Sequence, residues 1–235
     1  MLLARELAAS GIPVFRFDYR GMGDSLGEPR DFESISDDIR VALDVFLDKD
    51  PGVSKVVLWG LCDAATANAF YALSDERVMG QIALNPWART SEGEAEAYIR
   101  HYYLKRFFSR DFWRKVFSFE FDVSGSLKDL LHKLKQSRGT GSESVGESDQ
   151  RPLPVRLRDA QIGSVGPTLL ILSGQDLTAR EDESRVAEFP DWAGWMDSAE
   201  VTVCRLEEAD HTFSRARWRD QVAAWSRDWI HRLAD

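Results

Sequence analysis

Residues 56–64 read VVLWGLCDA, and this stretch decides how the chain is expected to fold. An apolar run reaches Gly60, Cys62 follows two positions later, and small residues from Ala64 onward are typical of a closely packed helix. A strand that turns sharply into a helix in this way lifts the residue at the turn above the carboxyl end of a parallel sheet. Small residues two positions before and two positions after the residue at the turn let strand and helix approach closely. The pattern G-x-C-x-A therefore predicts Cys62 as a nucleophile, with a thiol where a serine is usual.

Two later strands end in residues that would complete such a site. The apolar run at 167–174 is followed by Asp176, and the run at 201–206 is followed by His211. This kind of site needs the chain order nucleophile, acid, base, and Cys62, Asp176 and His211 follow it. We predict these three as the catalytic residues, with His211 moving the proton of the thiol and Asp176 orienting the imidazole.

Each of these predictions has a structural alternative. Cys62 could be a small residue that replaces a lost serine, and His211 could be an ordinary histidine of a surface loop. Asp210 is a second acid beside His211, although adjacent side chains do not easily face one another.

Asp63 directly follows the predicted nucleophile, at the position whose backbone N–H contributes to an oxyanion hole. A carboxylate there would oppose the developing negative charge unless it turns away and caps the helix that begins at Ala64. We predict the N–H of Asp63 as an oxyanion donor and its side chain as a helix cap. Positioning an amine, a water molecule or a cationic group of a substrate is the alternative.

The composition limits the classes of protein to which the chain can belong. A length of 235 residues with 43% hydrophobic residues is enough for one large α/β domain, and the net charge of -9 argues against nucleic-acid binding. No apolar run reaches membrane-spanning length, and no histidine or cysteine spacing predicts a metal or another cofactor. The two cysteines, Cys62 and Cys204, do not form a disulfide framework, so the cytoplasm is the expected location.

Strands alternate with helices along most of the chain, which predicts an α/β fold with a mostly parallel, doubly wound sheet. A strand is expected at 12–18, before the one at 56–61. Residues 1–87 are predicted as the first part of the core and 163–235 as the second part. Between them, 88–162 break the alternation with aromatic helical patterns and are predicted as a helical lid, with a flexible loop near 139–150.

The turn DYRGMGDS at 18–25 resembles the D-x-R-G-x-G-x-S segment of the α/β-hydrolase superfamily, and the resemblance extends over essentially the whole chain. More narrowly, residues 15–25, 60–64 and 172–179 resemble the exosortase-A-system-associated hydrolase of the first type, a family that accompanies exopolysaccharide and exosortase gene clusters in Gram-negative bacteria. The resemblance implies a cytoplasmic hydrolase, with proteins of an exopolysaccharide system as partners. A cysteine at the turn suits acyl transfer, so we predict an acyl hydrolase, an esterase or thioesterase, with a small-molecule acyl substrate.

The chain departs from the superfamily pattern at its start. The superfamily places two or three strands before its first helix, and the loop after the third strand supplies one oxyanion N–H. Here the first helix is expected from Leu2, so those strands and that donor are expected to be missing. The strands at 12–18 and 56–59 should then pair directly or leave their edges exposed. A catalytically weak or inactive binding partner, or an acyltransferase, is therefore the alternative to an acyl hydrolase.

Overall fold

The computed structural model describes residues 2–28, 30–86, 151–164, 166–175 and 189–234. By its contacts the chain divides into two compact units, one made of Met1–Arg89 and Pro152–Asp235 and the other of Thr90–Arg151. The predicted loop at 139–150, and all of the predicted lid before residue 151, lie outside the described residues.

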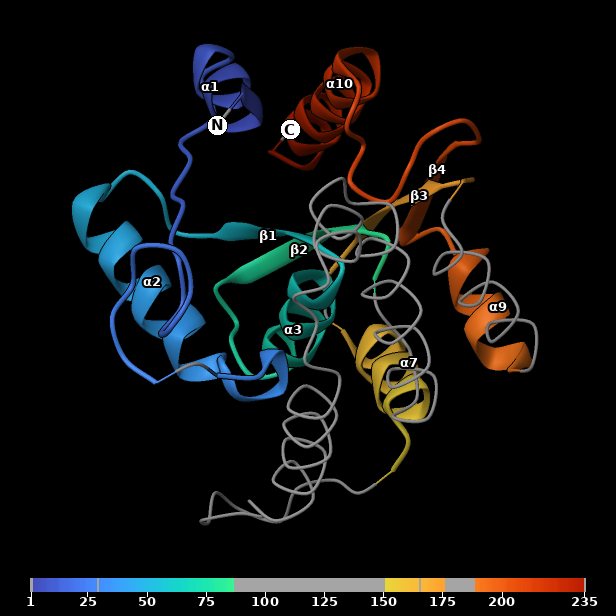
Figure 1. Ribbon diagram of the computed structural model, residues 1–235, viewed down its shortest axis with the longest axis horizontal. Helices are drawn as coiled ribbons and strands as arrows, with labels where there is room; N and C mark the ends of the chain where they lie inside the picture. The colour runs from blue at the N-terminus through green and yellow to red at the C-terminus, as the bar shows by residue number, and fades with distance from the viewer. Residues whose placement is uncertain (1, 29, 87–150, 165, 176–188, 235) are drawn as a thin grey trace, which may run out of the picture. The chain divides into compact units, whose positions relative to one another are not determined.

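Four strands form one parallel sheet in the order β1-β2-β3-β4 (Figure 1). They are β1 (Val56–Leu61), β2 (Val78–Leu84), β3 (Thr168–Ser173) and β4 (Val201–Leu206). Because every strand runs the same way, the residues that follow them all emerge at one edge of the sheet. The parallel α/β sheet predicted from the sequence is confirmed.

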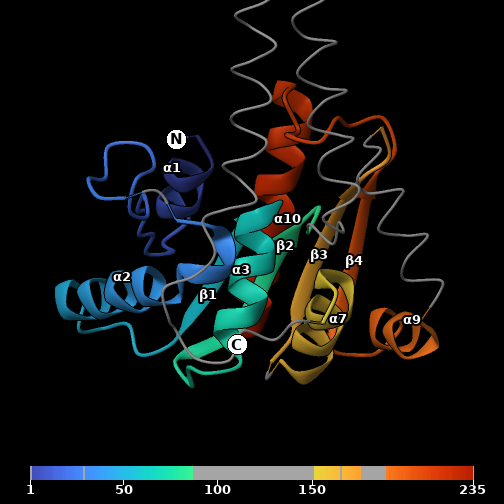
Figure 2. The ribbon, with the colours of Figure 1, turned by 60° about the horizontal axis from the view of Figure 1, so that its bottom comes forward.

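Helices cover both faces of this sheet (Figures 1 and 2). One face carries α2 (Ser36–Lys49), α3 (Asp63–Ala72), α7 (Leu153–Gly163) and α9 (Pro190–Met196), and the other carries α1 (Leu2–Ala9) and α10 (Ala216–Ala234). The 3-10 turn η1 (Phe32–Ser34) precedes α2. The sequence analysis predicts that the lid insertion extends to residue 162. In the structure α7 belongs to the first unit, where it packs against α3.

The strands divide their side chains between the two helical layers with the period of two that a sheet requires. Leu169 and Ile171 of β3 pack with Trp229 of α10, whereas Leu170 and its neighbours pack with Ala65 of α3. Both faces of β2 and β3 are therefore buried, which explains their continuous apolar sequences. Among the described helices, none is both long and apolar enough to cross a membrane.

The prediction of a strand at 12–18 is wrong. Residues 12–19 have no regular secondary structure, and of the described strands only β2 pairs with β1. A strand needs a neighbour for its N–H and C=O groups, and none of the described strands pairs with this segment. Direct pairing with β1 does not occur, and β1 is an edge strand among the described strands. Phe17 and Trp59 are 42% and 38% exposed.

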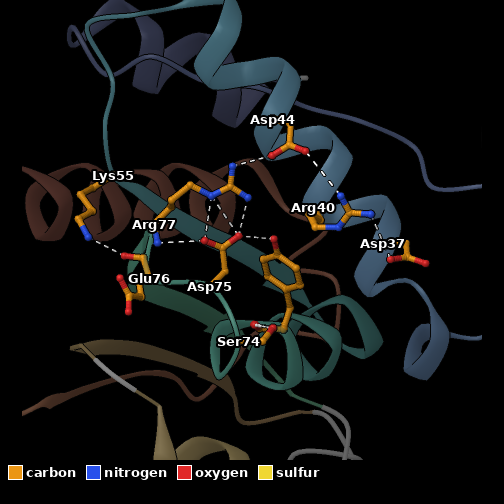
Figure 3. Close-up of polar contacts among 9 residues, drawn as sticks. Asp37, Arg40, Asp44, Lys55, Ser74, Asp75, Glu76 and Arg77 are labelled. Carbon is orange, nitrogen blue, oxygen red and sulfur yellow. Dashed lines mark hydrogen bonds and ion pairs between the residues drawn. The ribbon is translucent and has the colours of Figure 1, made fainter. Parts of the chain in front are cut away.

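A polar network joins α2 to the turn that leads from α3 into β2 (Figure 3). Arg77 binds Asp75 and Asp44 at 2.6 Å each, and the Tyr71 hydroxyl donates to Asp75. Burial and the bond to Asp75 raise the pKa of Tyr71 to about 12. Hydrogen bonds from the Arg77 guanidinium hold the pKa of Asp75 well below its usual range. The network lies at the end of α3 opposite Cys62 and fixes that helix against α2.

We expect Asp75→Asn to lower the free energy of unfolding at pH 7 by about 1.5–3 kcal/mol, the usual contribution of hydrogen bonds to a charged group. Since folding lowers the pKa of Asp75, its ionisation stabilises the wild type fully above about pH 4, and this contribution is lost as the pH falls further. The stability of the variant should therefore change less between pH 5 and pH 2. Urea unfolding followed by tryptophan fluorescence measures this.

Asp37→Asn is the matched control, because Asp37 is 68% exposed and its ion pair with Arg40 spans 3.4 Å. It should change stability by less than about 0.5 kcal/mol at every pH. Tyr71→Phe tests the alkaline side. Because folding raises the pKa of Tyr71, this group stabilises the folded wild type fully below about pH 10, and the contribution is lost as the pH rises through about 12. Identical acid limbs for Asp75→Asn and wild type would show that the network does not act in this way.

Candidate active site

Cys62 makes the whole turn between β1 and α3 by itself. The strand ends at Leu61, the helix begins at Asp63, and Cys62 has φ 61° and ψ -125°. A residue other than glycine in this region costs about 1–3 kcal/mol and persists only where its surroundings hold it there. The Cys62 N–H donates to the Leu84 carbonyl at 2.9 Å, and the Cys62 carbonyl accepts from Ala65 N–H at 3.0 Å. The sharp turn predicted from the sequence is thus present, with a half-buried thiol at its apex.

Gly60 explains why the motif requires glycine two positions before the turn. A Cβ at this position would lie 2.6 Å from the backbone nitrogen of Ala65 and 2.7 Å from the carbonyl carbon of Ala64. No real Cβ makes such contacts with backbone atoms, which cannot move aside without moving α3. The first turn of α3 therefore packs directly against the end of β1, and this close approach fixes the position of Cys62.

Asp63 is the first residue of α3, the N-cap position is Cys62, and no side-chain cap bond forms there, so Asp63 is not the cap that the sequence predicts. The Asp63 Oδ1 accepts from the Ala64 N–H at 3.0 Å, so its carboxylate is held by the first turn of α3. The backbone N–H of Asp63 has no acceptor among the described residues, which leaves it available as an oxyanion donor. Burial raises the pKa of Tyr19, and the negative charges of Asp63 and Asp31 raise it further.

His211 lies in the loop after β4, which is anchored on both sides of the histidine. Ala209 is fully buried and Phe213 is 2% exposed, with Phe213 at φ 51°. Asp210 accepts hydrogen bonds from the N–H of Ser214, at 2.9 Å, and from its hydroxyl. These bonds lower the pKa of Asp210 and hold its carboxylate within the turn. Asp210 therefore has a structural role in shaping the loop that carries His211.

The loops after β3 and β4 are bonded to each other along their backbones. Gly174 N–H donates to the Leu206 carbonyl at 2.9 Å, and Gln175 N–H donates to the Ala209 carbonyl at 3.0 Å. A Cβ on Gly174 would lie 2.4 Å from the Glu207 carbonyl oxygen, so the two loops touch. Asp176, the predicted acid, lies outside the described residues, but the residue before it is bonded to the loop of His211.

Asn85 is a residue that the sequence reasoning missed. It follows β2 directly, is 1% exposed, and has φ 40°. Its Nδ2 donates to the Ser173 hydroxyl and to the His211 carbonyl, both at 2.9 Å, and its Oδ1 accepts from Ser173 N–H at 2.9 Å. An asparagine that ends a buried strand was the only available signal, because its partners are about 90 and 125 residues away along the chain.

Cys204 lies within β4, opposite Ile171 of β3, and both cysteines of the chain are free. Burial raises the pKa of the Cys204 thiol, although Arg232 acts in the opposite direction. Cys204 is therefore a strand residue of the core, in agreement with its simpler interpretation from the sequence. Within the part of the chain that the structure describes, no group of three or more His, Cys, Asp or Glu side chains is placed to hold a metal ion.

A parallel sheet covered on both faces, with a strained turn from strand to helix at its carboxyl edge, defines the fold of an α/β hydrolase. Residues 1–225 match the model of the alpha/beta hydrolase family, and the chain belongs to this family. Comparison with the curated proteins gives no match to this sequence.

Solved structures with the same fold include enzymes of known type. An esterase from Pyrococcus furiosus superposes with a TM-score of 0.65 at 14% identity, covering 98% of this chain and 74% of that one. A monoacylglycerol lipase from Paleococcus ferrophilus gives 0.59 at 17% identity, covering 99% and 88%. The esterase domain of a Rhodothermus marinus protein gives 0.54 at 19% identity, covering 98% and 77%. At these identities the likeness establishes the fold.

The strain at Cys62 can be measured with two variants that both lack the thiol. Glycine adopts a positive φ freely whereas alanine does not, so Cys62→Gly should be more stable than Cys62→Ala by about 1 kcal/mol. Urea unfolding of the two variants gives the difference. The same pair of substitutions at Cys204, inside β4, should give the opposite order, because glycine weakens a strand. Equal stability of the two Cys62 variants would mean that the turn is unstrained.

Proposed function

We propose that the chain is an acyl hydrolase that cleaves an ester or thioester through Cys62. The observation that carries the proposal is the backbone of Cys62, which presents its thiol at a strained turn between β1 and α3. Strain of this kind collects at functional sites, since a purely structural turn would be more stable with glycine. Membership of the α/β-hydrolase family and the esterase and lipase folds among similar structures support hydrolysis as the reaction.

In the proposed reaction His211 takes the proton of the Cys62 thiol as the sulfur attacks the acyl carbonyl carbon. The carbonyl oxygen gains the negative charge, which the Asp63 N–H stabilises. The carbon–oxygen or carbon–sulfur bond to the leaving group then breaks, and His211 returns the proton to the departing alcohol or thiol. Water attacks the acyl-cysteine, and His211 takes one proton from that water. As the carbon–sulfur bond breaks, His211 returns the proton to the sulfur of Cys62, so the carboxylic acid and the free thiol are released. Asp176 would orient the imidazole and stabilise its charge.

The substrate and biological setting are proposed from the resemblance stated above. Residues 15–25, 60–64 and 172–179 support a role beside an exopolysaccharide and exosortase system, with a small-molecule acyl compound as the substrate and proteins of that system as partners. An acyl group on sugar or on a thiol carrier would fit this setting.

One observation favours a second candidate, a weakly active binding partner. Asp63, whose N–H is the proposed oxyanion donor, also carries a carboxylate beside the turn, and a negative charge there opposes the developing oxyanion. Turnover rates therefore separate the two candidates, and an added acyl acceptor separates hydrolysis from acyl transfer.

We expect Cys62→Ala to lower the hydrolysis of a p-nitrophenyl ester or an acyl thioester by about 1000-fold or more. In the wild type, iodoacetamide should label Cys62 before Cys204, because burial and a raised pKa slow the reaction of Cys204. Steady-state kinetics and mass spectrometry of the labelled peptides measure both effects.

Cys204→Ala is the matched control and should hydrolyse the substrates at close to the wild-type rate. Full activity in Cys62→Ala would contradict the proposal, and equally slow labelling of both thiols would favour the binding partner.

A further inference from the structure

We propose that Asn85 is a positioning residue that fixes the backbone of His211 relative to Cys62. This inference rests on the proposed function, since it assigns Asn85 to the same nucleophile and base. Nothing in the reaction requires Asn85 to touch the substrate. Its role is to hold the loop of the base at the correct distance from the turn of the nucleophile.

The side chain of Asn85 links the ends of two strands to the histidine loop. An asparagine amide has two N–H donors and a carbonyl acceptor. In Asn85 one donor goes to the Ser173 hydroxyl and the other to the His211 carbonyl, while Oδ1 accepts from Ser173 N–H. All three bonds measure 2.9 Å, and the side chain is almost fully buried. Both N–H groups and the carbonyl oxygen of the amide are therefore hydrogen-bonded, and rotation of the amide would break all three bonds.

The backbone next to Asn85 holds Cys62. The carbonyl of Leu84 accepts from Cys62 N–H at 2.9 Å, and the N–H of Asn85 donates to the Ile171 carbonyl at 3.0 Å. Two consecutive residues thus hold the nucleophile on one side and the loop of the base on the other. This dipeptide at the end of β2 therefore links the backbone of Cys62 to the backbone of His211.

Asparagine suits both the backbone conformation of this position and the hydrogen bonds that its side chain makes. The backbone has φ 40°, in the left-handed region, which asparagine, aspartate and glycine tolerate better than other residues. Aspartate could accept from Ser173 N–H, but its carboxylate could not donate to the His211 carbonyl. Glycine would adopt the backbone conformation but would make none of the three side-chain bonds. These two residues therefore separate the backbone requirement from the requirement for the bond to His211.

The test compares Asn85→Asp and Asn85→Gly with Ser173→Ala, which removes one partner of Asn85 but leaves its bond to His211. We expect both Asn85 variants to lower kcat by about 10- to 100-fold with little change in KM, because small displacements of catalytic groups act on the chemical step. Ser173→Ala should keep most of the wild-type kcat. Circular dichroism and urea unfolding establish that each variant is folded.

A double-mutant cycle separates positioning from general structural damage. If Asn85 acts through the base, Asn85→Gly should have almost no further effect on kcat in a His211→Ala background. Additive losses, a normal kcat in a folded Asn85 variant, or an equal loss in Ser173→Ala would each overturn the inference. The proposed function fails separately, if Cys62→Ala stays active.

If neither Asn85 variant folds, NMR of the unaltered protein tests whether the hydrogen bond from Asn85 to His211 is formed. Coupling across the hydrogen bond from the Asn85 side-chain nitrogen to the His211 carbonyl carbon is the expected result. A rapidly exchanging Asn85 amide without that coupling would overturn the inference.

Discussion

The backbone conformation of Cys62 is the constraint on which the rest of the site depends. One residue turns the chain from β1 into α3, and it does so at a positive φ that an L-residue disfavours. The conformation is held because Gly60 lets the first turn of α3 touch the strand and because Leu84 accepts the Cys62 N–H. Packing between strand and helix therefore supplies the energy that offsets the strain, and the thiol is left at the edge of the sheet.

The parallel sheet extends this local constraint to the other candidate residues. Since all four strands end at the same edge, the loops after β1, β3 and β4 all lie along that edge although they are far apart along the chain. Backbone bonds join the loop after β3 to the loop after β4, and Asn85 joins the end of β2 to both. The site is thus a set of strand ends that brace one another, which suits a reaction that needs fixed distances between groups.

Much of this arrangement could be predicted because the relevant signals are local. The G-x-C-x-A pattern around Cys62 predicts both the turn and the closely packed helix within five residues, and the continuous apolar sequence of β3 reflects burial on both faces. Each depends on contacts within a few residues or on the burial of a whole strand.

Features that depend on residues far away along the chain could not be predicted from the sequence. Residues 12–18 carry the apolar composition of a strand, but a strand also needs a neighbour, and the composition does not reveal whether one is present. Asn85 similarly depends on Ser173 and His211, which no local pattern connects to it. The boundary of α7 was missed because its packing against α3, and not its own sequence, assigns it to the core unit.

The central claim is that the strained turn exists to present a nucleophile, and trapping the covalent intermediate tests it most directly. The protein is mixed with a chromogenic acyl ester, quenched in acid within the first turnovers, digested and examined by mass spectrometry. Our account predicts the acyl group as a thioester on the peptide that contains Cys62, formed and lost at rates consistent with turnover. Acylation of a different residue, or turnover without any acyl-cysteine, would contradict it.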